Sequence, residues 1–340
     1  MKILVFKIGA IGDVLLTTRA IEKIKKTFPD SKIHYFVGKR AAPILENNPF
    51  IDKIIIFEEL YPHLPKFFKI IAMKNYYKKI FSTEIYDYFI DFESSYYSTY
   101  ISFYIKAKQK IGFKISDKKR YLLNFIYNKR VTYTEKNLYV ANRYLYLASL
   151  LGFKFEKIQM PPILKLTEEE IKFGKNFLKV NEIKENDIKI MLCPSGTWIT
   201  KRWKKEYWLE LINLINKNIK NAKIIILWGP GDKDIISSMP GILIPETNLR
   251  QLASIIYFGD IIVSNDSGVR HIASALNKKT IGLFGPTNEH GWAYQDKNNI
   301  ILTSAVPCRP CDKTKCNDIK CMNEILPDTV FKSIQSIINS

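Results

Sequence analysis

A short segment in the C-terminal half of the chain has the residue types that bind an anion. The β-branched run Ile261–Val263 predicts a buried parallel strand, and Asp266, Ser267 and Gly268 follow it as turn and capping residues. A helical pattern comes next, with His271 in its first turn. The first backbone N–H groups of a helix have no partner within it, and the helix dipole adds positive potential there. The segment therefore predicts a diphosphate site, although Asp266 or Ser267 acting only as a helix cap is an alternative.

Two more turns in this half of the chain have similar features. The predicted strand Thr280–Phe284 ends in Gly285-Pro286-Thr287, about one helix after the first turn. The predicted strand Ile188–Leu192 leads to Pro194-Ser195-Gly196-Thr197 and then to Lys201. Lys201 either binds a negatively charged group or is a loop lysine exposed to solvent.

A carboxylate follows another predicted strand of the same half. The predicted strand Lys223–Trp228 ends in Gly229-Pro230-Gly231, and Asp232 comes directly afterwards. A carboxylate past the carboxyl end of a strand is well placed to accept hydrogen bonds from ribose hydroxyls, and Asp234 is an alternative. An Asp-x-Asp metal motif in the required context is absent from the sequence, so we expect that catalysis needs no divalent ion.

The N-terminus carries a different kind of turn. A hydrophobic strand over residues 3–8 is followed by Gly9 and Gly12, and then by an amphipathic helix to about Thr27. The full G-x-G-x-x-G fingerprint is absent, and Asp13 stands where a phosphate would be expected. A carboxylate there would repel a diphosphate but suits a hydroxyl group or an amine. Asp13 is therefore either a proton acceptor or a residue that complements the helix dipole.

Three blocks of sequence together resemble glycosyltransferase family 9, which contains the lipopolysaccharide heptosyltransferases. They are the opening segment Ile8–Thr17, the segment Pro194–Trp208 with Lys201-Arg202-Trp203, and the segment Asp266–Thr287 with Asp266-Ser267-Gly268-x-x-His271 and Phe284-Gly285-Pro286-Thr287. The departures are small: Lys204 stands where a proline commonly follows the tryptophan, and Ser267 replaces a frequent threonine. Neither change removes a functional group.

The resemblance implies an α/β fold of GT-B architecture, with two Rossmann-like β/α/β domains facing a central cleft. We place the boundary at Met160-Pro161-Pro162, where a proline pair interrupts the hydrophobic periodicity. Residues 1–162 would form the acceptor-binding domain, and residues 163–340 the domain that binds the nucleotide sugar. A length of 340 residues also favours two domains.

The resemblance also implies an activity, the transfer of a heptose with inversion at its anomeric carbon. The donor would be a nucleotide-diphosphate sugar such as ADP-heptose, and the acceptor would be the lipopolysaccharide inner core, on Kdo-lipid A. Asp13 would be the general base, Lys201 would stabilise the leaving diphosphate, and Gly9 and Gly12 would contact the acceptor. The donor would bind to Ser195, Gly196, Thr197, Asp232, Asp266, Ser267, Gly268, His271, Gly285, Pro286 and Thr287. The alternatives are another nucleotide sugar, a relative without catalysis, or a basic nucleic-acid-binding protein.

The charge of the chain leaves several partners open. It contains 52 Lys+Arg against 33 Asp+Glu, a formal net charge of +19, so an anionic membrane, substrate or nucleic acid could attract it. Lysine is frequent nearly everywhere, which favours a general compositional bias, and no helix-turn-helix, zinc-finger or RNP pattern supports nucleic acid. The basic, aromatic segment Tyr61–Phe81 would lie on an anionic membrane, frame an acceptor groove, or pack its aromatic side inward.

Four cysteines, Cys308, Cys311, Cys316 and Cys321, crowd together near the C-terminus. In a reducing compartment such a cluster favours a metal over disulfides, so a structural zinc is one expectation, beside reduced thiols or a disulfide. The sequence has no apolar run long enough for a transmembrane helix and no recognisable signal peptide. We therefore expect a cytoplasmic protein, with attachment to the inner face of the inner membrane as an option.

Overall fold

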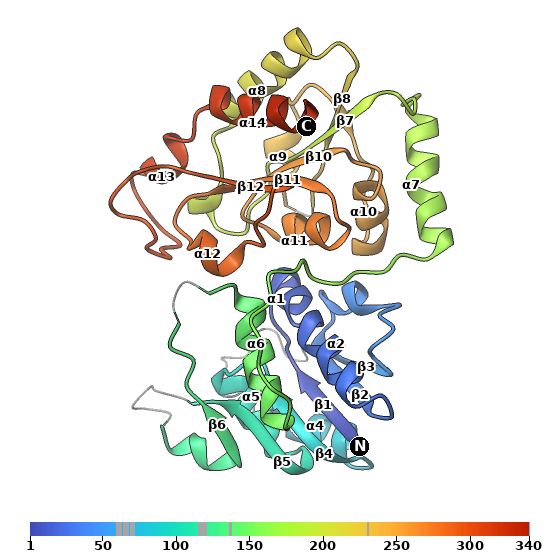
Figure 1. Ribbon diagram of the computed structural model, residues 1–340, viewed down its shortest axis with the longest axis vertical. Coiled ribbons are helices and arrows are strands. Elements are labelled where there is room, and N and C mark those ends of the chain that lie inside the picture. The colour runs from blue at the N-terminus through green and yellow to red at the C-terminus, as the bar shows by residue number, and fades with distance from the viewer. Residues whose placement is uncertain are drawn as a thin grey trace. The chain divides into compact units, whose positions relative to one another are not determined.

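The chain forms two compact units, Met1–Ile158 and Gln159–Ser340, each built around a six-stranded sheet (Figure 1). The division falls just before the proline pair that the sequence analysis took as the domain boundary. The functional roles of the two domains stay predictions. The computed structural model describes residues 1–58, 63, 68, 72–114, 121–135, 138–229 and 231–339.

The sheet of the first unit is parallel throughout, in the order β3-β2-β1-β4-β5-β6. Its central strands are largely buried because helices cover both faces, and Ile3, Leu4 and Val5 of the innermost strand are not exposed at all. The order is that of a Rossmann-like fold. The strands are β1 (Lys2–Phe6), β2 (Lys32–Gly38), β3 (Lys53–Phe57), β4 (Ile85–Asp91), β5 (Lys106–Phe113) and β6 (Lys129–Val131).

Helices cover the two faces of this sheet. On one face lie α1 (Ile11–Leu16), α2 (Thr18–Thr27) and α6 (Val140–Ala148), and on the other lie α4 (Lys74–Phe81) and α5 (Tyr96–Ser102) (Figure 1). The single helix expected up to Thr27 is divided at Thr17, whose hydroxyl donates to the carbonyl of Val14 at 2.7 Å and competes with the helix ladder. Nine of the 21 residues of the segment Tyr61–Phe81 lie outside the described residues, and its end, Lys74–Phe81, forms α4.

The helix expected over Ala41–Asn47 is only a 3-10 turn, Ala42–Leu45. Asn47 takes a left-handed conformation with φ of 60°, which ends the turn, and Pro49 follows it. The expectation of a full helix was therefore wrong at this place.

The second unit repeats the strand order of the first. Its sheet is parallel and runs β12-β11-β10-β7-β8-β9, so the first strand of the unit again lies beside the fourth. The two parallel sheets confirm the expected α/β class with two Rossmann-like units. The strands are β7 (Ile188–Cys193), β8 (Ala222–Ile226), β9 (Ile242–Leu243), β10 (Ile261–Asn265), β11 (Lys279–Phe284) and β12 (Asn299–Thr303).

Helices also cover both faces of the second sheet. Those with a large buried side are α8 (Lys205–Asn218) and α14 (Pro327–Ile338) on one face, and α7 (Glu168–Val180), α10 (Leu249–Ile256) and α11 (Gly268–Ala275) on the other (Figure 1). Three short helices are α9 (Lys233–Ile236), α12 (Glu289–Trp292) and α13 (Lys320–Asn323). Within the described ranges, every helix is too short or too polar to cross a bilayer.

The capping box expected before α7 is confirmed. The Thr167 hydroxyl accepts a hydrogen bond from the Glu170 amide at 3.2 Å, and the Thr167 amide donates to the Glu170 carboxylate at 2.7 Å. The same carboxylate receives Arg250 of α10 at 2.6 Å. The start of α7 is therefore joined to α10 by an ion pair as well as by packing.

Gly174 should be required for the packing of α7 on α10, because a Cβ there would overlap with the carbonyl oxygen of Ser254. Alanine favours a helix by about 1 kcal/mol over glycine. We expect the forced separation of the helices to outweigh this gain and to make Gly174→Ala less stable by about 1–3 kcal/mol. All five tryptophans lie in the second unit, so urea unfolding followed by tryptophan fluorescence reports on it. Lys175→Ala, at an exposed position of α7, is the control, and a Gly174→Ala protein as stable as the parent would contradict the prediction.

Candidate active site

The strand order reverses at one place in each sheet, between β1 and β4 in the first unit and between β7 and β10 in the second. Ligands of open parallel sheets bind outside the carboxyl ends of the strands at such a place. The Gly9–Asp13 turn leaves β1, and the loops at Ser195 and Asp266 leave β7 and β10. Each unit therefore places its predicted functional residues where its fold favours a ligand.

Asp13 lies in the first turn of α1, where the helix dipole favours a carboxylate. Its Oδ1 is 3.5 Å from the Nζ of Lys7, and it accepts a hydrogen bond from the Tyr144 hydroxyl at 3.3 Å. The Lys7 ammonium also lies 3.2 Å from Glu93, which accepts a hydrogen bond from the amide of Gly9. The carboxylate is thus held in place and still partly exposed, at 24% of its side chain.

The ammonium group of Lys7, which lies beside Asp13, is buried. Burial disfavours the ammonium of Lys7, yet the negative charges of Asp13 and Glu93 more than offset this, so the pKa of Lys7 is raised. Burial also raises the pKa of Tyr144, so that its hydroxyl keeps the proton that it donates to Asp13. A carboxylate with these two neighbours is oriented to accept a proton from a third group.

The sequence analysis missed Lys7, Glu93 and Tyr144. The position of Lys7 directly before the Gly9 turn was a usable signal, because it follows the same strand. Glu93 follows β4, the neighbour of β1 in the sheet, and Tyr144 comes from α6. Only the sheet order brings these last two beside Asp13. Gly12, by contrast, is buried in α1.

Lys201 and the end of β10 form the central contact of the second unit. The Lys201 ammonium lies 2.6 Å from Oδ2 of Asp266, and the hydroxyl of Thr287 donates to the same oxygen at 2.8 Å. The ammonium also lies 4.3 Å from the centre of the Trp198 ring. Asp266 and Thr287 are buried. The contact therefore fixes Lys201 at the carboxyl ends of β10 and β11.

The start of α11 is arranged differently from a capped helix. Ser267 occupies the N-cap position in an extended conformation, but its side chain makes no capping hydrogen bond within the described residues. The Asp266 carboxylate is directed to Lys201 and Thr287. Ser267 is therefore the N-cap residue by position, as one alternative expected, but its hydroxyl contributes no capping hydrogen bond within the described residues. The first N–H groups of α11, from Gly268 onward, keep the character of an anion site.

His271 lies inside α11 with 5% of its surface exposed. Its ring nitrogens are 3.2 and 3.5 Å from the Arg270 guanidinium, which donates to the carbonyl of Trp292 at 2.6 Å. Burial, with the charges of Arg270 and Lys201, holds the pKa of His271 well below its usual value. His271 is therefore a neutral imidazole that can form hydrogen bonds but adds no charge.

Asp232 joins two of the predicted turns. Its Oδ2 accepts a hydrogen bond from the Ser195 hydroxyl at 2.6 Å and from the Gly229 amide at 3.0 Å, and it is 7% exposed. The carboxylate thus braces the loops after β7 and β8, and its expected contact with a ribose stays a prediction. The alternative, Asp234, lies exposed on α9.

The loop after β7 has two further attachments. Asn265, at the end of β10, donates to the carbonyl of Pro194 at 2.9 Å, and the Arg202 guanidinium donates to the carbonyl of Gly196 at 2.7 Å. Thr197 is exposed. The expected donor residues of this loop therefore lie beside the end of β10, although contact with a donor is untested.

The cysteine-rich segment packs on the Gly285-Pro286-Thr287 turn, which the sequence analysis did not foresee. The carbonyl of Pro286 accepts hydrogen bonds from the amides of Cys311 and Asp312 at 2.8 and 2.9 Å. Arg309 donates to the carbonyl of Gly285 at 3.0 Å and pairs with Glu289 at 2.6 Å. This segment therefore supports one of the predicted phosphate turns.

The four clustered cysteines are free thiols. Cys321 is buried, and its pKa is raised by burial and by the other three thiols, whereas Cys308, Cys311 and Cys316 are exposed. In the part of the chain that the structure describes, no three Cys, His, Asp or Glu side chains are gathered so that they could hold a metal ion. The arrangement gives no support to the expected zinc site, which stays a prediction.

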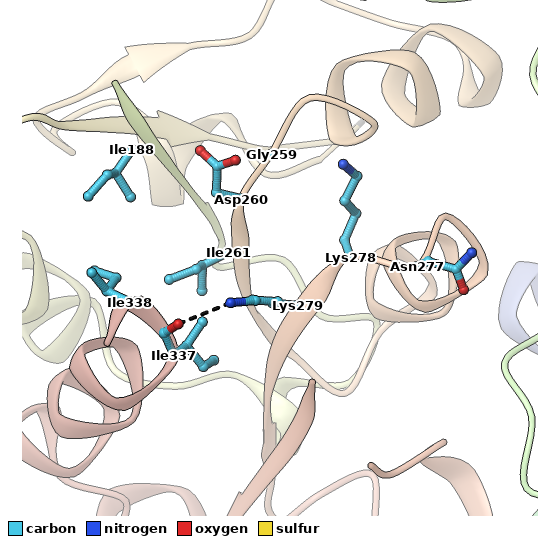
Figure 2. Close-up of a pocket in the computed structure, with 9 residues that line it drawn as sticks. All are labelled: Ile188, Gly259, Asp260, Ile261, Asn277, Lys278, Lys279, Ile337 and Ile338. Atoms are coloured by element: carbon cyan, nitrogen blue, oxygen red, sulfur yellow. Dashed lines mark hydrogen bonds between the residues drawn. The ribbon is translucent and has the colours of Figure 1, made fainter. Parts of the chain in front are cut away.

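A pocket of about 370 Å³ lies at the opposite edge of the second sheet, where β7, β10 and β11 begin (Figure 2). The Lys279 ammonium crosses it to the carbonyl of Ile337 at 3.1 Å. Because it lies at the amino ends of the strands, it is separate from the candidate site. Its lining residues are Ile188, Gly259, Asp260, Ile261, Asn277, Lys278, Lys279, Ile337 and Ile338.

The strand orders and the loops outside them place both units among the nucleotide-binding α/β folds. The chain belongs to glycosyltransferase family 9 (heptosyltransferase), whose profile matches residues 77–321. The protein is therefore a glycosyltransferase, and the family resemblance expected from its three sequence motifs is confirmed.

Relatives resemble the chain over nearly its whole length. It is 26% identical to lipopolysaccharide heptosyltransferase 1 of Campylobacter coli, with 99% of each chain covered. It is 27% identical to lipooligosaccharide heptosyltransferase 2 of Haemophilus ducreyi, with 89% of this chain and 88% of the relative covered. The first of these matches includes the N-terminal motif, which the family profile does not reach.

Two solved structures show the same fold. A glycosyl transferase family 9 protein from Veillonella parvula has a TM-score of 0.82 at 20% identity, covering 100% of this chain and 97% of that one. The E. coli heptosyltransferase WaaC with ADP has a TM-score of 0.72 at 19% identity, covering 100% of this chain and 98% of that one. The expected GT-B fold class is thereby confirmed.

Acidification should destabilise the second unit through His271. Below about pH 6.5, the His271 imidazole binds a proton in the unfolded chain but resists protonation in the folded chain, because its pKa there is lowered. The free energy of unfolding therefore falls as the pH falls. The effect is at most about 1.4 kcal/mol for each pH unit. Between about pH 7.5 and 5.5, we expect the parent to lose about 1 kcal/mol more than His271→Gln in urea unfolding followed by tryptophan fluorescence. Equal losses in the two proteins would show that His271 does not resist protonation.

Proposed function

We propose that this glycosyltransferase moves a heptose from ADP-heptose to the lipopolysaccharide inner core, with inversion at the anomeric carbon. The observation that carries the proposal is the contact of Lys201 with the Asp266 carboxylate, which also accepts the Thr287 hydroxyl, beside the start of α11. Further support comes from relatives that are lipopolysaccharide heptosyltransferases and from E. coli WaaC, solved with ADP and with ADP-2-deoxy-2-fluoro heptose.

In this proposal the second unit binds the donor. The diphosphate lies at the first N–H groups of α11, with Gly268 allowing close approach and His271 donating a neutral hydrogen bond. The ammonium of Lys201 turns from Asp266 toward the diphosphate as the bond to the sugar breaks. Because negative charge grows on the leaving group in that step, Lys201 and the helix start stabilise the transition state more than the bound donor. The other proposed donor contacts are Ser195, Gly196, Thr197, Asp232, Asp266, Ser267, Gly285, Pro286 and Thr287.

The first unit binds the acceptor and supplies the base. Asp13 takes the proton of the acceptor hydroxyl as that oxygen attacks the anomeric carbon, and the bond between this carbon and the diphosphate oxygen breaks on the opposite side. Because the acceptor oxygen attacks from the side opposite the leaving diphosphate, the configuration of this carbon is inverted. Lys7 and Tyr144 hold the Asp13 carboxylate in one orientation. The partly exposed Gly9 lets the backbone approach the acceptor sugar, whereas Gly12 packs inside α1.

Two finer points complete the proposal. The reaction needs no divalent ion, since Lys201 and the helix start carry out the charge stabilisation. The enzyme works in the cytoplasm at the inner face of the inner membrane, where a lipid-linked acceptor such as Kdo-lipid A would be found. A transferase that uses another nucleotide sugar is the alternative.

Titration calorimetry with ADP, UDP, GDP and CMP, in the presence of a chelator, tests the donor. We expect ADP to bind most tightly, and Lys201→Gln to weaken ADP binding by about tenfold or more, since a charged hydrogen bond to the diphosphate is lost. Lys204→Gln, at an exposed position nearby, is the control and should bind as the parent does. No binding of any nucleoside diphosphate would contradict the proposal, and tighter binding of another nucleotide would favour the alternative donor.

Asp13→Asn separates a base from a helix-start residue. Asparagine keeps the size and capping ability of aspartate, so loss of a purely structural role should change turnover little. Loss of a base should lower turnover at saturating acceptor by roughly 10²–10⁴-fold while ADP affinity stays unchanged. Asp30→Asn, an exposed change in the same unit, is the matched control. If folded Asp13→Asn turns over within a few-fold of the parent, another group is the base.

A further inference from the structure

Two phenylalanines of the first unit form an exposed apolar pair. Phe103 follows α5, and Phe125 lies in the 3-10 turn Tyr121–Ile126. Their side chains are 49% and 71% exposed, and their ring centres are 6.1 Å apart. Single exposed apolar side chains are common, but large apolar side chains that remain exposed while touching one another mark an interaction site.

The pair is continuous with a row of tyrosine rings that leads into the core. Phe103 lies 6.4 Å from Tyr100, and Tyr100 lies 5.6 Å from Tyr104, with their hydroxyls 2.9 Å apart. Tyr104 in turn lies 5.8 Å from Tyr77 of α4, which is fully buried. The two exposed rings are therefore in contact with a row of aromatic side chains that packs into the core of the unit.

The segments that carry this pair are basic. Residues 103–114 and 121–131 include six basic residues and no acidic one, namely Lys106, Lys108, Lys110, Lys114, Lys129 and Arg130, although Lys108 pairs with Asp87 of β4 at 2.7 Å. Lys110 donates to the carbonyl of Ser102 at 2.6 Å, which places an ammonium beside Phe103. The first unit contains 28 Lys+Arg against 14 Asp+Glu, and the second contains 24 against 19. The charge excess is concentrated in the first unit, contrary to the even spread expected from composition.

We propose that Phe103, Phe125 and the basic residues around them form a surface that docks on an anionic lipid bilayer. Phenylalanine rings enter the boundary between headgroups and acyl chains, and tyrosines lie at headgroup level. Lysines add electrostatic attraction to anionic headgroups, of about tenfold in affinity for every one or two charges near the surface. The charge of this surface is complementary to such a membrane. The surface does not depend on the identity of the donor, so its test is independent of the proposed reaction.

The test is flotation of the full chain with lipid vesicles. We expect binding to phosphatidylcholine vesicles that contain about 30% phosphatidylglycerol, weak binding to pure phosphatidylcholine, and a steep loss of binding as salt is added. Phe103→Ser combined with Phe125→Ser should reduce affinity for the anionic vesicles by about tenfold or more, because two apolar insertions are lost. The matched control combines Val180→Ser and Leu326→Ser in the second unit, whose parent side chains are 71% and 52% exposed.

A second comparison separates local charge from net charge. Lys106→Gln with Lys114→Gln should weaken vesicle binding, whereas Lys172→Gln with Lys175→Gln, which removes the same charge from α7, should not. Circular dichroism and thermal unfolding establish that each variant is folded, and Phe125→Ser alone replaces the double variant if that one is not. The proposal would be overturned if a variant of the proposed surface and its matched control in the second unit lost the same affinity for vesicles. It would also be overturned if the parent showed no preference for anionic vesicles. It would also be overturned if single-stranded RNA bound the parent at the same salt and displaced it from the vesicles, since the surface would then serve nucleic acid.

Discussion

Parallel pairing is the constraint on which both units depend, because it brings the carboxyl ends of all strands in a sheet to one edge. In the second unit this edge collects the loops after β7, β8, β10 and β11. Asn265, the last residue of β10, binds the carbonyl of Pro194 and accepts a hydrogen bond from the amide of Trp203. One side chain thus holds both ends of the loop that carries Lys201, and it can do so only because β10 pairs with β7.

Each unit holds a lysine against carboxylates at this edge. Lys7 lies between Asp13 and Glu93, and Lys201 lies against Asp266. A buried ion pair adds little net stability, since removing both charges from water offsets much of their attraction. Such pairs are nevertheless suited to holding a charge in one place. In both units the lysine lies where the strand order favours a ligand, so these pairs are better explained by positioning than by stability.

The two units use their hydrophobic residues differently. The core of the second unit is mainly aliphatic, around Trp208 and the facing sides of α8 and α14. The first unit packs rings, including Phe6, Phe36 and Tyr77, between its sheet and the helices α4 and α5. These rings continue through Tyr104 and Tyr100 to the exposed pair Phe103 and Phe125. The aromatic side chains of the first unit therefore form much of its core and also pack against its exposed phenylalanine pair.

Local features of this protein could be predicted from its sequence. Runs such as Ile261–Val263 could be predicted as buried strands because β-branched residues favour strands over helices and turn residues follow the run. The capping box of Thr167 and Glu170 could be placed because its hydrogen bonds join residues three positions apart, and the start of α11 because turn and capping residue types precede its helical pattern. The motifs at Gly9 and Asp266 similarly identified the family.

The partners of these residues were decided by the tertiary structure alone. Tyr144 reaches Asp13 from a distant helix, and Thr287 meets Lys201 at Asp266 only because β10 and β11 are neighbours. The low pKa of His271 and the raised pKa of Lys7 also depend on burial, which no local pattern specifies. Sequence determines what each short segment can form, because its hydrogen bonds and hydrophobic periodicity are local. Strand order and the exclusion of water decide which distant side chains meet and which charges they keep.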